Sequence, residues 1–259
     1  MKKTIWLTSL VRSEEAVKKL ISQLKTYGLE TKGHFWEEDL EKMAWMNARE
    51  ELIKPDVGLW LILAASENLL IPAIRYGLSL LTITIQAQRG LSFPLVILFT
   101  QGSPPSSEAL PTPLRGVDFL SLTDPGMAAK LVAKVHAQVK EASSEYRLDL
   151  YGNPQIGQWF EVGPRNSSWP GAMFGVAGGE ITFHAVGRKG SLPSQSVLHY
   201  PMKGLKLNLG EKEHKAWAAQ NELGPGDSYF IKVKGFPESI IFGPYSSQEA
   251  TDVYVLKIN

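Results

Sequence analysis

The sequence predicts an α/β domain built on a five-stranded, doubly wound parallel sheet, followed by a mostly β domain. Two observations support this prediction. Apolar strand-like runs alternate with helix-period segments over the first 145 residues, which is typical of parallel strands joined by right-handed helical crossovers. After residue 145 the long helical periods stop, and short strand-like runs separated by glycine, proline and serine take over, as in β sandwiches and barrels.

The first domain is expected over residues 1–145. Its strands are predicted at residues 4–10, 30–35, 57–65, 94–100 and 117–122. The run 57–65 is apolar almost without a break, as expected of a strand whose two faces are both covered. Helices are predicted at residues 13–27, 40–53, 72–86 and 127–142. Ser13 is a suitable N-cap for the first helix, and Gly28 is a suitable stop.

The second domain is expected over residues 146–259 as a sandwich or a barrel-like fold. Its strands are predicted at residues 158–162, 172–176, 181–186, 196–200, 205–209, 229–233, 239–242 and 253–258. A helical turn or two is possible at residues 211–221. Gly178-Gly179 lies between two of the strand-like runs and predicts a two-residue hairpin turn. Trp159, Trp169 and Trp217 either pack in the core or form an aromatic binding face, and core packing is favoured because large aromatic side chains dominate small β cores.

Composition narrows the function classes. The chain has 27 lysines and arginines against 26 aspartates and glutamates, a balance that argues against nucleic acid or an anionic membrane surface as a partner. There are no cysteines, so disulfides and thiolate metal sites are excluded and a reducing, cytoplasmic location is expected. The longest apolar run is shorter than the about 20 residues that cross a bilayer. The five histidines are scattered singly, so no metal site is expected.

The expected ligand site follows from the topology of the first domain. In an open α/β sheet, ligands bind beyond the carboxyl ends of the strands. In a flavodoxin-like strand order the first and third strands are neighbours, so the residues that follow them converge. The candidate ligand-binding residues are Thr8, Ser9, Arg12, Ser66, Glu67 and Asn68. Arg12 and the helix beginning at Ser13 favour a phosphate or carboxylate there, unless these residues only cap helices and close turns.

Other motifs are weak or missing. The first βα turn has no glycine, and neither a P-loop nor a G-x-S-x-G elbow occurs, so the common phosphate-binding and hydrolase signatures are absent. Residues 34–39 form the most polar cluster at a strand end. Their functional interpretation is a metal or general-acid site, and the alternative is a solvated loop in which Glu38 or Asp39 caps the next helix.

Residues 3–9, 47–66 and 74–80 resemble the Toll/interleukin-1 receptor (TIR) family and the related nucleoside deoxyribosyltransferase-like domains, over about residues 4–140. The resemblance implies a flavodoxin-like fold. Catalytic members place a glutamate on the helix after the third strand, where it stabilises positive charge on the ribose. The matching position here is Arg75, which has the opposite charge, and Glu67 lies eight residues earlier. The second domain resembles no family.

Three functions compete. The leading hypothesis is a non-catalytic signalling or interaction protein whose TIR-like domain associates with itself or a protein partner, while the β domain recognises a second molecule. The second is an enzyme acting on NAD or a nucleoside, with Glu67 as the acidic residue and Ser9 and Ser66 holding the ribose or phosphate. The third is a sensor that binds NAD or another nucleotide without cleaving it. No other cofactor is expected.

Overall fold

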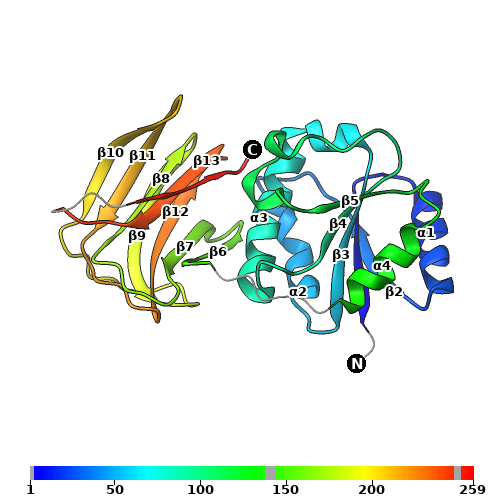
Figure 1. The fold of residues 1–259 in the computed structure, drawn as a ribbon. Coiled ribbons are helices and arrows are strands. Elements are labelled where there is room, and N and C mark those ends of the chain that lie inside the picture. Colours follow the sequence, from blue (N-terminus) through cyan, green and yellow to red (C-terminus); the bar gives the residue numbers. More distant parts are fainter. Residues whose placement is uncertain (1–2, 138–143, 248–251) are drawn as a thin grey trace. The chain divides into compact units, whose positions relative to one another are not determined.

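The computed structural model describes residues 3–137, 144–247 and 252–259. The chain splits into two compact units, Met1–Leu110 with Leu114–Ala142, and Pro111–Pro113 with Ser143–Asn259. The first has a parallel sheet with helices and the second has antiparallel sheets (Figure 1). The division at residue 145 into independently folding domains stays a prediction. Within the described ranges no helix is both long and apolar enough to span a bilayer.

The first unit contains a five-stranded parallel sheet in the order β2-β1-β3-β4-β5. This is the second common order of doubly wound sheets. Its strands are β1 (Thr4–Ser9), β2 (Glu30–Phe35), β3 (Val57–Ala64), β4 (Leu95–Phe99) and β5 (Asp118–Ser121). All of β3 is buried, as its apolar run predicts.

Helices cover both faces of this sheet, with α1 and α4 on one side and α3 on the other (Figure 1). The helices are α1 (Glu14–Thr26), α2 (Arg49–Leu52), α3 (Pro72–Arg89) and α4 (Met127–His136), with short 3₁₀ turns at Ala44–Ala48, Ser66–Leu70, Ser107–Ala109 and Thr112–Leu114. Leu20 and Leu24 of α1 and Leu131 of α4 pack on the alternate residues of the central strands. On the other face α3 packs closely on Trp36, which directly follows β2, because a Cβ at Gly77 would lie 2.7 Å from Cζ2 of that ring.

Two helix predictions need adjustment. The helix expected at residues 40–53 is broken into a 3₁₀ turn and the four-residue α2. Met43, just before the turn, has φ of 52°, and this left-handed conformation interrupts a regular helix. The helix expected at residues 72–86 continues to Arg89 as α3, and the Thr82 and Thr84 hydroxyls donate to carbonyl oxygens of the preceding turn. The last part of the helix expected at 127–142 lies outside the described residues.

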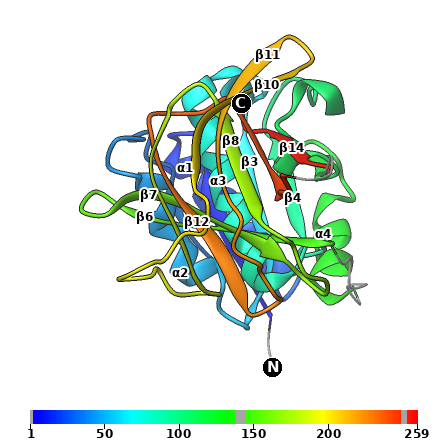
Figure 2. The same ribbon diagram turned by 90° about the vertical axis from the view of Figure 1, so that its left-hand side faces the viewer.

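The second unit is a sandwich of two antiparallel sheets (Figure 1 and Figure 2). One has the order β10-β11-β8-β13-β14 and the other β6-β7-β12-β9. The strands are β6 (Tyr146–Asn153), β7 (Gly157–Pro164), β8 (Ala172–Ala177), β9 (Glu180–Arg188), β10 (Met202–Leu209), β11 (Lys212–Ala219), β12 (Asp227–Lys234), β13 (Ser239–Pro244) and β14 (Tyr254–Lys257). The core lies between the sheets, where the Phe160 and Phe174 rings are 5.1 Å apart.

Several β-domain predictions were wrong. Gly178-Gly179 does not close a hairpin: β8 and β9 belong to different sheets, and both glycines, with φ of 76° and 75°, turn the chain from one sheet to the other. Residues 196–200 form no strand, because this stretch is part of a loop held by side-chain bonds. Residues 211–221 are mostly the strand β11 and not a helical turn. Strand β6 has no counterpart among the predictions.

Candidate functional site

The first candidate site is the carboxyl edge of the parallel sheet. Strands β1 and β3 are neighbours, with Thr8 opposite Ile62 and Ser9 opposite Leu63. The adjacency that the proposed cleft requires is therefore present. What the cleft can bind depends on whether the polar side chains at these strand ends are free.

The two polar residues that end β1 are used inside the fold. Thr8 is fully buried, and its Oγ1 accepts a hydrogen bond of 2.9 Å from Nε1 of the buried Trp60. Ser9 is 1% exposed, and its Oγ donates to the carbonyl oxygen of Val11 at 2.7 Å. Both hydroxyls satisfy buried partners that would otherwise lack a hydrogen bond, so neither is presented to solvent.

The residues after β3 form the 3₁₀ turn Ser66–Leu70. The Asn68 Oδ1 accepts a 2.8 Å bond from the backbone N–H of Ala65, which closes the turn. Glu67 is exposed, and its Oε1 accepts from the Gln101 amide at 3.1 Å. Ser66 is half-buried against the loop after β4, where a Cβ at Gly102 would lie 2.0 Å from its Oγ. The loops after β3 and β4 are thus packed together.

Arg12 is the most available cation of this edge. Its side chain is exposed and has no hydrogen-bond or ion-pair partner among the described residues. It directly precedes Ser13, whose Oγ accepts from the Ala16 N–H and caps α1. The macrodipole of this 13-residue helix adds partial positive charge beside Arg12.

Arg75, which the expected TIR resemblance would place at the position of a glutamate, lies in the first turn of α3. It is half-buried, and its buried Nε has no hydrogen-bond partner in the described structure. The guanidinium therefore brings positive charge into a partly desolvated place.

The polar cluster at residues 34–39 divides into two parts. Asp39 caps a turn, because its Oδ1 accepts from the Lys42 N–H at 2.9 Å and its Oδ2 pairs with the Lys42 ammonium. His34 packs on Trp6 with ring centroids 5.7 Å apart, and burial lowers its pKa. The His34 Nδ1 and the Nε1 atoms of Trp6 and Trp36 are buried without a hydrogen-bond partner. Sequence reasoning did not single out these indole groups.

No group of three or more histidine, aspartate or glutamate side chains within the described ranges is arranged to hold a metal ion. The three β-domain tryptophans do not share a face. Trp159 lies beside Phe183 and Lys232, Trp169 is buried, and Trp217 packs against His184. The hypothesis of one aromatic face built from all three is therefore wrong.

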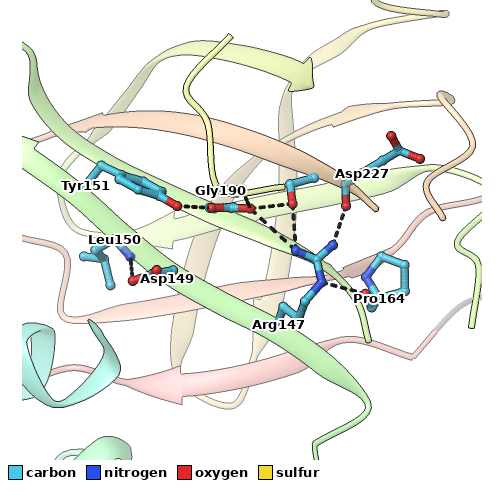
Figure 3. A network of polar contacts seen from close by, with 9 residues as sticks. Arg147, Asp149, Leu150, Tyr151, Pro164, Gly190 and Asp227 are labelled. Carbon is cyan, nitrogen blue, oxygen red and sulfur yellow. Dashed lines mark hydrogen bonds and ion pairs between the residues drawn. The ribbon is translucent and has the colours of Figure 1, made fainter. Parts of the chain in front are cut away.

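A network of buried polar side chains joins strands β6, β7 and β12 of the second unit (Figure 3). The Arg147 guanidinium and the Glu161 carboxylate, 10% and 4% exposed, approach to 3.5 Å. Glu161 also accepts from the Ser228 hydroxyl at 2.6 Å, from the Tyr151 hydroxyl, and from the Gly190 N–H at 2.9 Å. We call this network the Arg147–Glu161 clamp.

The clamp holds distant backbone segments together. Arg147 donates to the carbonyl oxygens of Pro164, at 2.9 Å, and of Asp227, and burial lowers its pKa. Its bond to Asp227 is made by the main chain, and Figure 3 shows the Asp227 carboxylate pointing away from the guanidinium. Through Gly190 the clamp also fixes the start of the loop after β9. Its charged groups are largely satisfied internally, which indicates a structural role.

Next to the clamp is an open polar cleft of about 820 Å³. Its polar lining side chains are Ser168, His199, Gln220, Asn221, Glu222 and Asp227. Pro170 and Val186 supply apolar surface. The volume falls in the range of about 300–1,000 Å³ typical of ligand sites. We call it the β-domain cleft.

The walls of the β-domain cleft are tied to one another. The Asn221 Oδ1 accepts from the His199 N–H at 2.8 Å, and its Nδ2 donates to the Val197 carbonyl at 2.9 Å. The Gln220 N–H donates to the His199 carbonyl at 2.8 Å. No sequence motif identifies the cleft, because its residues come from three loops and from strands β9 and β12, which meet only in the folded sandwich.

Comparisons with known proteins assign this chain to no family. No family model matches it, and no curated protein matches it. One similar solved structure is a 3-dehydroquinate dehydratase-like protein from Bifidobacterium longum, with 18% sequence identity and a TM-score of 0.33. The match covers 52% of this chain and 97% of that one. At this level the likeness supports no statement about function.

Proposed function

We propose that this is a non-catalytic interaction protein. Its TIR-like α/β domain associates with itself or with a partner protein, and its β domain recognises a second molecule. The observation that supports this proposal best is the use of the strand-end side chains. Thr8, Ser9 and Asn68 all make hydrogen bonds inside the fold, which leaves few groups to bind or activate a substrate.

Charge at the helix after β3 also argues against glycosidic cleavage. An oxocarbenium-like ribose is stabilised by a nearby anion, whereas Arg75 places a half-buried cation there. Glu67 is exposed and already accepts a bond from Gln101. A carboxylate in water, paired with an amide, gives less transition-state stabilisation than one held in a dry site.

Nicotinamide release from NAD by the purified full chain tests the proposal. We expect no release above that of a buffer blank, and the same result for Glu67→Ala. Release by the wild type that disappears in Glu67→Ala would establish the enzyme hypothesis instead. Sedimentation velocity over a range of concentrations tests self-association. If the chain stays monomeric at all concentrations, the proposed association must be with a different protein.

A nucleotide sensor is the second candidate, and Arg12 is the observation that favours it. An unpaired arginine beside a helix N-terminus suits a phosphate group. Calorimetry with NAD, ATP and ADP on the wild type and on Arg12→Ala tests this function. Weaker binding by Arg12→Ala would support the sensor. Equal binding by both proteins, or none by either, would remove it.

A further inference from the structure

The free groups of the β-domain cleft indicate what kind of ligand fits it. The side chains of Ser168, His199, Gln220 and Glu222 line it and have no hydrogen-bond or ion-pair partner among the described residues. Together they present a hydroxyl, an imidazole, a carboxamide and a carboxylate. Donors and acceptors are therefore mixed around the cleft, as a ligand rich in hydroxyl groups requires, because each hydroxyl both donates and accepts.

The charge of the lining excludes anionic ligands. Glu222 and Asp227 are the charged residues that line the cleft, and no lysine or arginine is among the lining residues. Asp227 Oδ2 accepts from the Gly224 N–H at 3.2 Å, while its other oxygen stays available. A phosphate or nucleotide would meet two carboxylates without a compensating cation. The ligand must be neutral or positively charged.

The cleft is held in shape before any ligand arrives. Asn221 joins the His199 and Val197 backbone, and the clamp fixes the Asp227 backbone through Arg147. A site with fixed walls loses little conformational entropy on binding. A ligand whose individual polar contacts are weak can therefore bind here, because its binding energy is not spent on ordering a loop of the protein.

An exposed aromatic ring adjoins the cleft in sequence. Tyr200 directly follows His199, and its side chain is 77% exposed. Its backbone has φ of 44°, a left-handed conformation that is uncommon for a residue with a bulky side chain. Pro170 and Val186 add apolar surface inside the cleft. Tyr200 itself is not among the residues that line the cleft, so the apolar surface there is that of Pro170 and Val186. Apolar surface beside mixed polar groups matches the two sides of a sugar ring, its C–H face and its hydroxyl edge.

We propose that the β-domain cleft binds a neutral oligosaccharide. This inference rests on the recognition role proposed for the β domain and names its ligand class. Gln220 and Glu222 bond sugar hydroxyls, and Pro170 and Val186 contact the C–H face of a sugar ring. The Arg147–Glu161 clamp acts as a positioning device that keeps Asp227 and the segment after Gly190 in place.

Nuclear magnetic resonance titration of the ¹⁵N-labelled full chain tests the proposal. The probes are cellotetraose, chitotetraose, maltotetraose and mannotetraose, and the Gln220→Ala spectrum assigns the Gln220 side-chain amide. We expect at least one saccharide to shift that amide and the backbone signals around Asn221. Its dissociation constant should rise about tenfold in Gln220→Ala and in Glu222→Ala, as expected for one lost hydrogen bond to a charged or amide group.

Two matched controls sharpen the test. Glu213→Ala removes an exposed carboxylate on β11 that pairs with Lys206, and it should leave saccharide affinity unchanged. Tyr200→Ala removes an exposed side chain outside the lining of the cleft, and it should also leave saccharide affinity unchanged. Affinity that survives both Gln220→Ala and Glu222→Ala would place binding elsewhere and overturn the inference.

Titration with spermine distinguishes two outcomes: that the cleft binds a ligand other than a saccharide, and that the cleft binds no ligand. If spermine shifts the cleft signals with a steep salt dependence and no saccharide does, the cleft recognises cations. The saccharide inference then fails and the recognition role stands. If neither spermine nor any saccharide shifts the cleft signals, both fail. The nicotinamide assay is unaffected by either result.

Discussion

Removing the Glu161 carboxylate is the sharpest test of the clamp. In Glu161→Leu the Arg147 guanidinium keeps its bonds to the Pro164 and Asp227 carbonyls but stays buried without the carboxylate that pairs with it. The Ser228 hydroxyl and the Gly190 N–H lose their acceptor as well. Breaking a buried ion pair in this way costs about 3–5 kcal/mol. The β domain should lose that amount of unfolding free energy.

Hydrogen exchange of β12 amides, followed by mass spectrometry in low urea, measures this loss within the β domain alone. Opening free energies of core strands approach the global unfolding free energy. The exposed pair Lys206–Glu213 is the matched control, since Glu213→Leu should change stability by only about 0–1 kcal/mol. The double variant Arg147→Met/Glu161→Leu should recover most of the loss, because it leaves no unpaired charge.

The reasoning about the clamp fails if Glu161→Leu costs no more than Glu213→Leu. It also fails if the double variant loses as much unfolding free energy as Arg147→Met and Glu161→Leu lose together when each is measured alone. Either result would mean that water enters the network and screens the ion pair in the folded protein.

Three further predictions concern stability. Thr8→Val should lose about 1–3 kcal/mol in urea unfolding, because the buried Trp60 N–H loses its acceptor, while Thr8→Ser should lose less. Gly77→Ala should destabilise by about 1–3 kcal/mol despite the better helix propensity of alanine, because its Cβ would overlap the buried Trp36 ring; a gain in stability would contradict this packing. Burial lowers the pKa of His184 to about 4 from 6.5, so the unfolded chain binds a proton between these values and the folded chain does not. The unfolding free energy should therefore be highest above about pH 6.5 and fall by up to about 3 kcal/mol toward pH 4. The urea midpoint of His184→Gln should depend less on pH than that of the wild type, and an equal dependence in the two proteins would contradict this.

Local sequence signals predicted the α/β half well. The apolar run at residues 57–65 is the fully buried β3, and Ser13 caps α1 as its side chain suggests. These predictions succeed because burial pattern and capping act within a few residues. The break at Met43 was missed, since a left-handed residue other than glycine has no reliable sequence signal.

The β half was harder to predict because sheet membership depends on distant partners. Gly178-Gly179 has the composition of a hairpin turn, but strands β8 and β9 pair with strands far along the chain. The clamp joins Arg147 and Glu161 to Ser228, and its members become neighbours only through strand register. The β-domain cleft depends on the same long-range pairing. For the α/β edge, the topology of β1 and β3 was predictable, but the internal bonds of Thr8 and Ser9 were not.

The position of β8 has a consequence for synthesis on the ribosome. All six residues of this central strand are buried, and its two partners, β11 and β13, both lie later in the chain. About forty residues separate the end of β8 from the end of β11, so at about 5–20 residues per second the strand waits on the order of 2–8 s for its first partner. During that interval β8 is an apolar strand without its partners, which makes the incomplete β domain prone to association with other nascent chains.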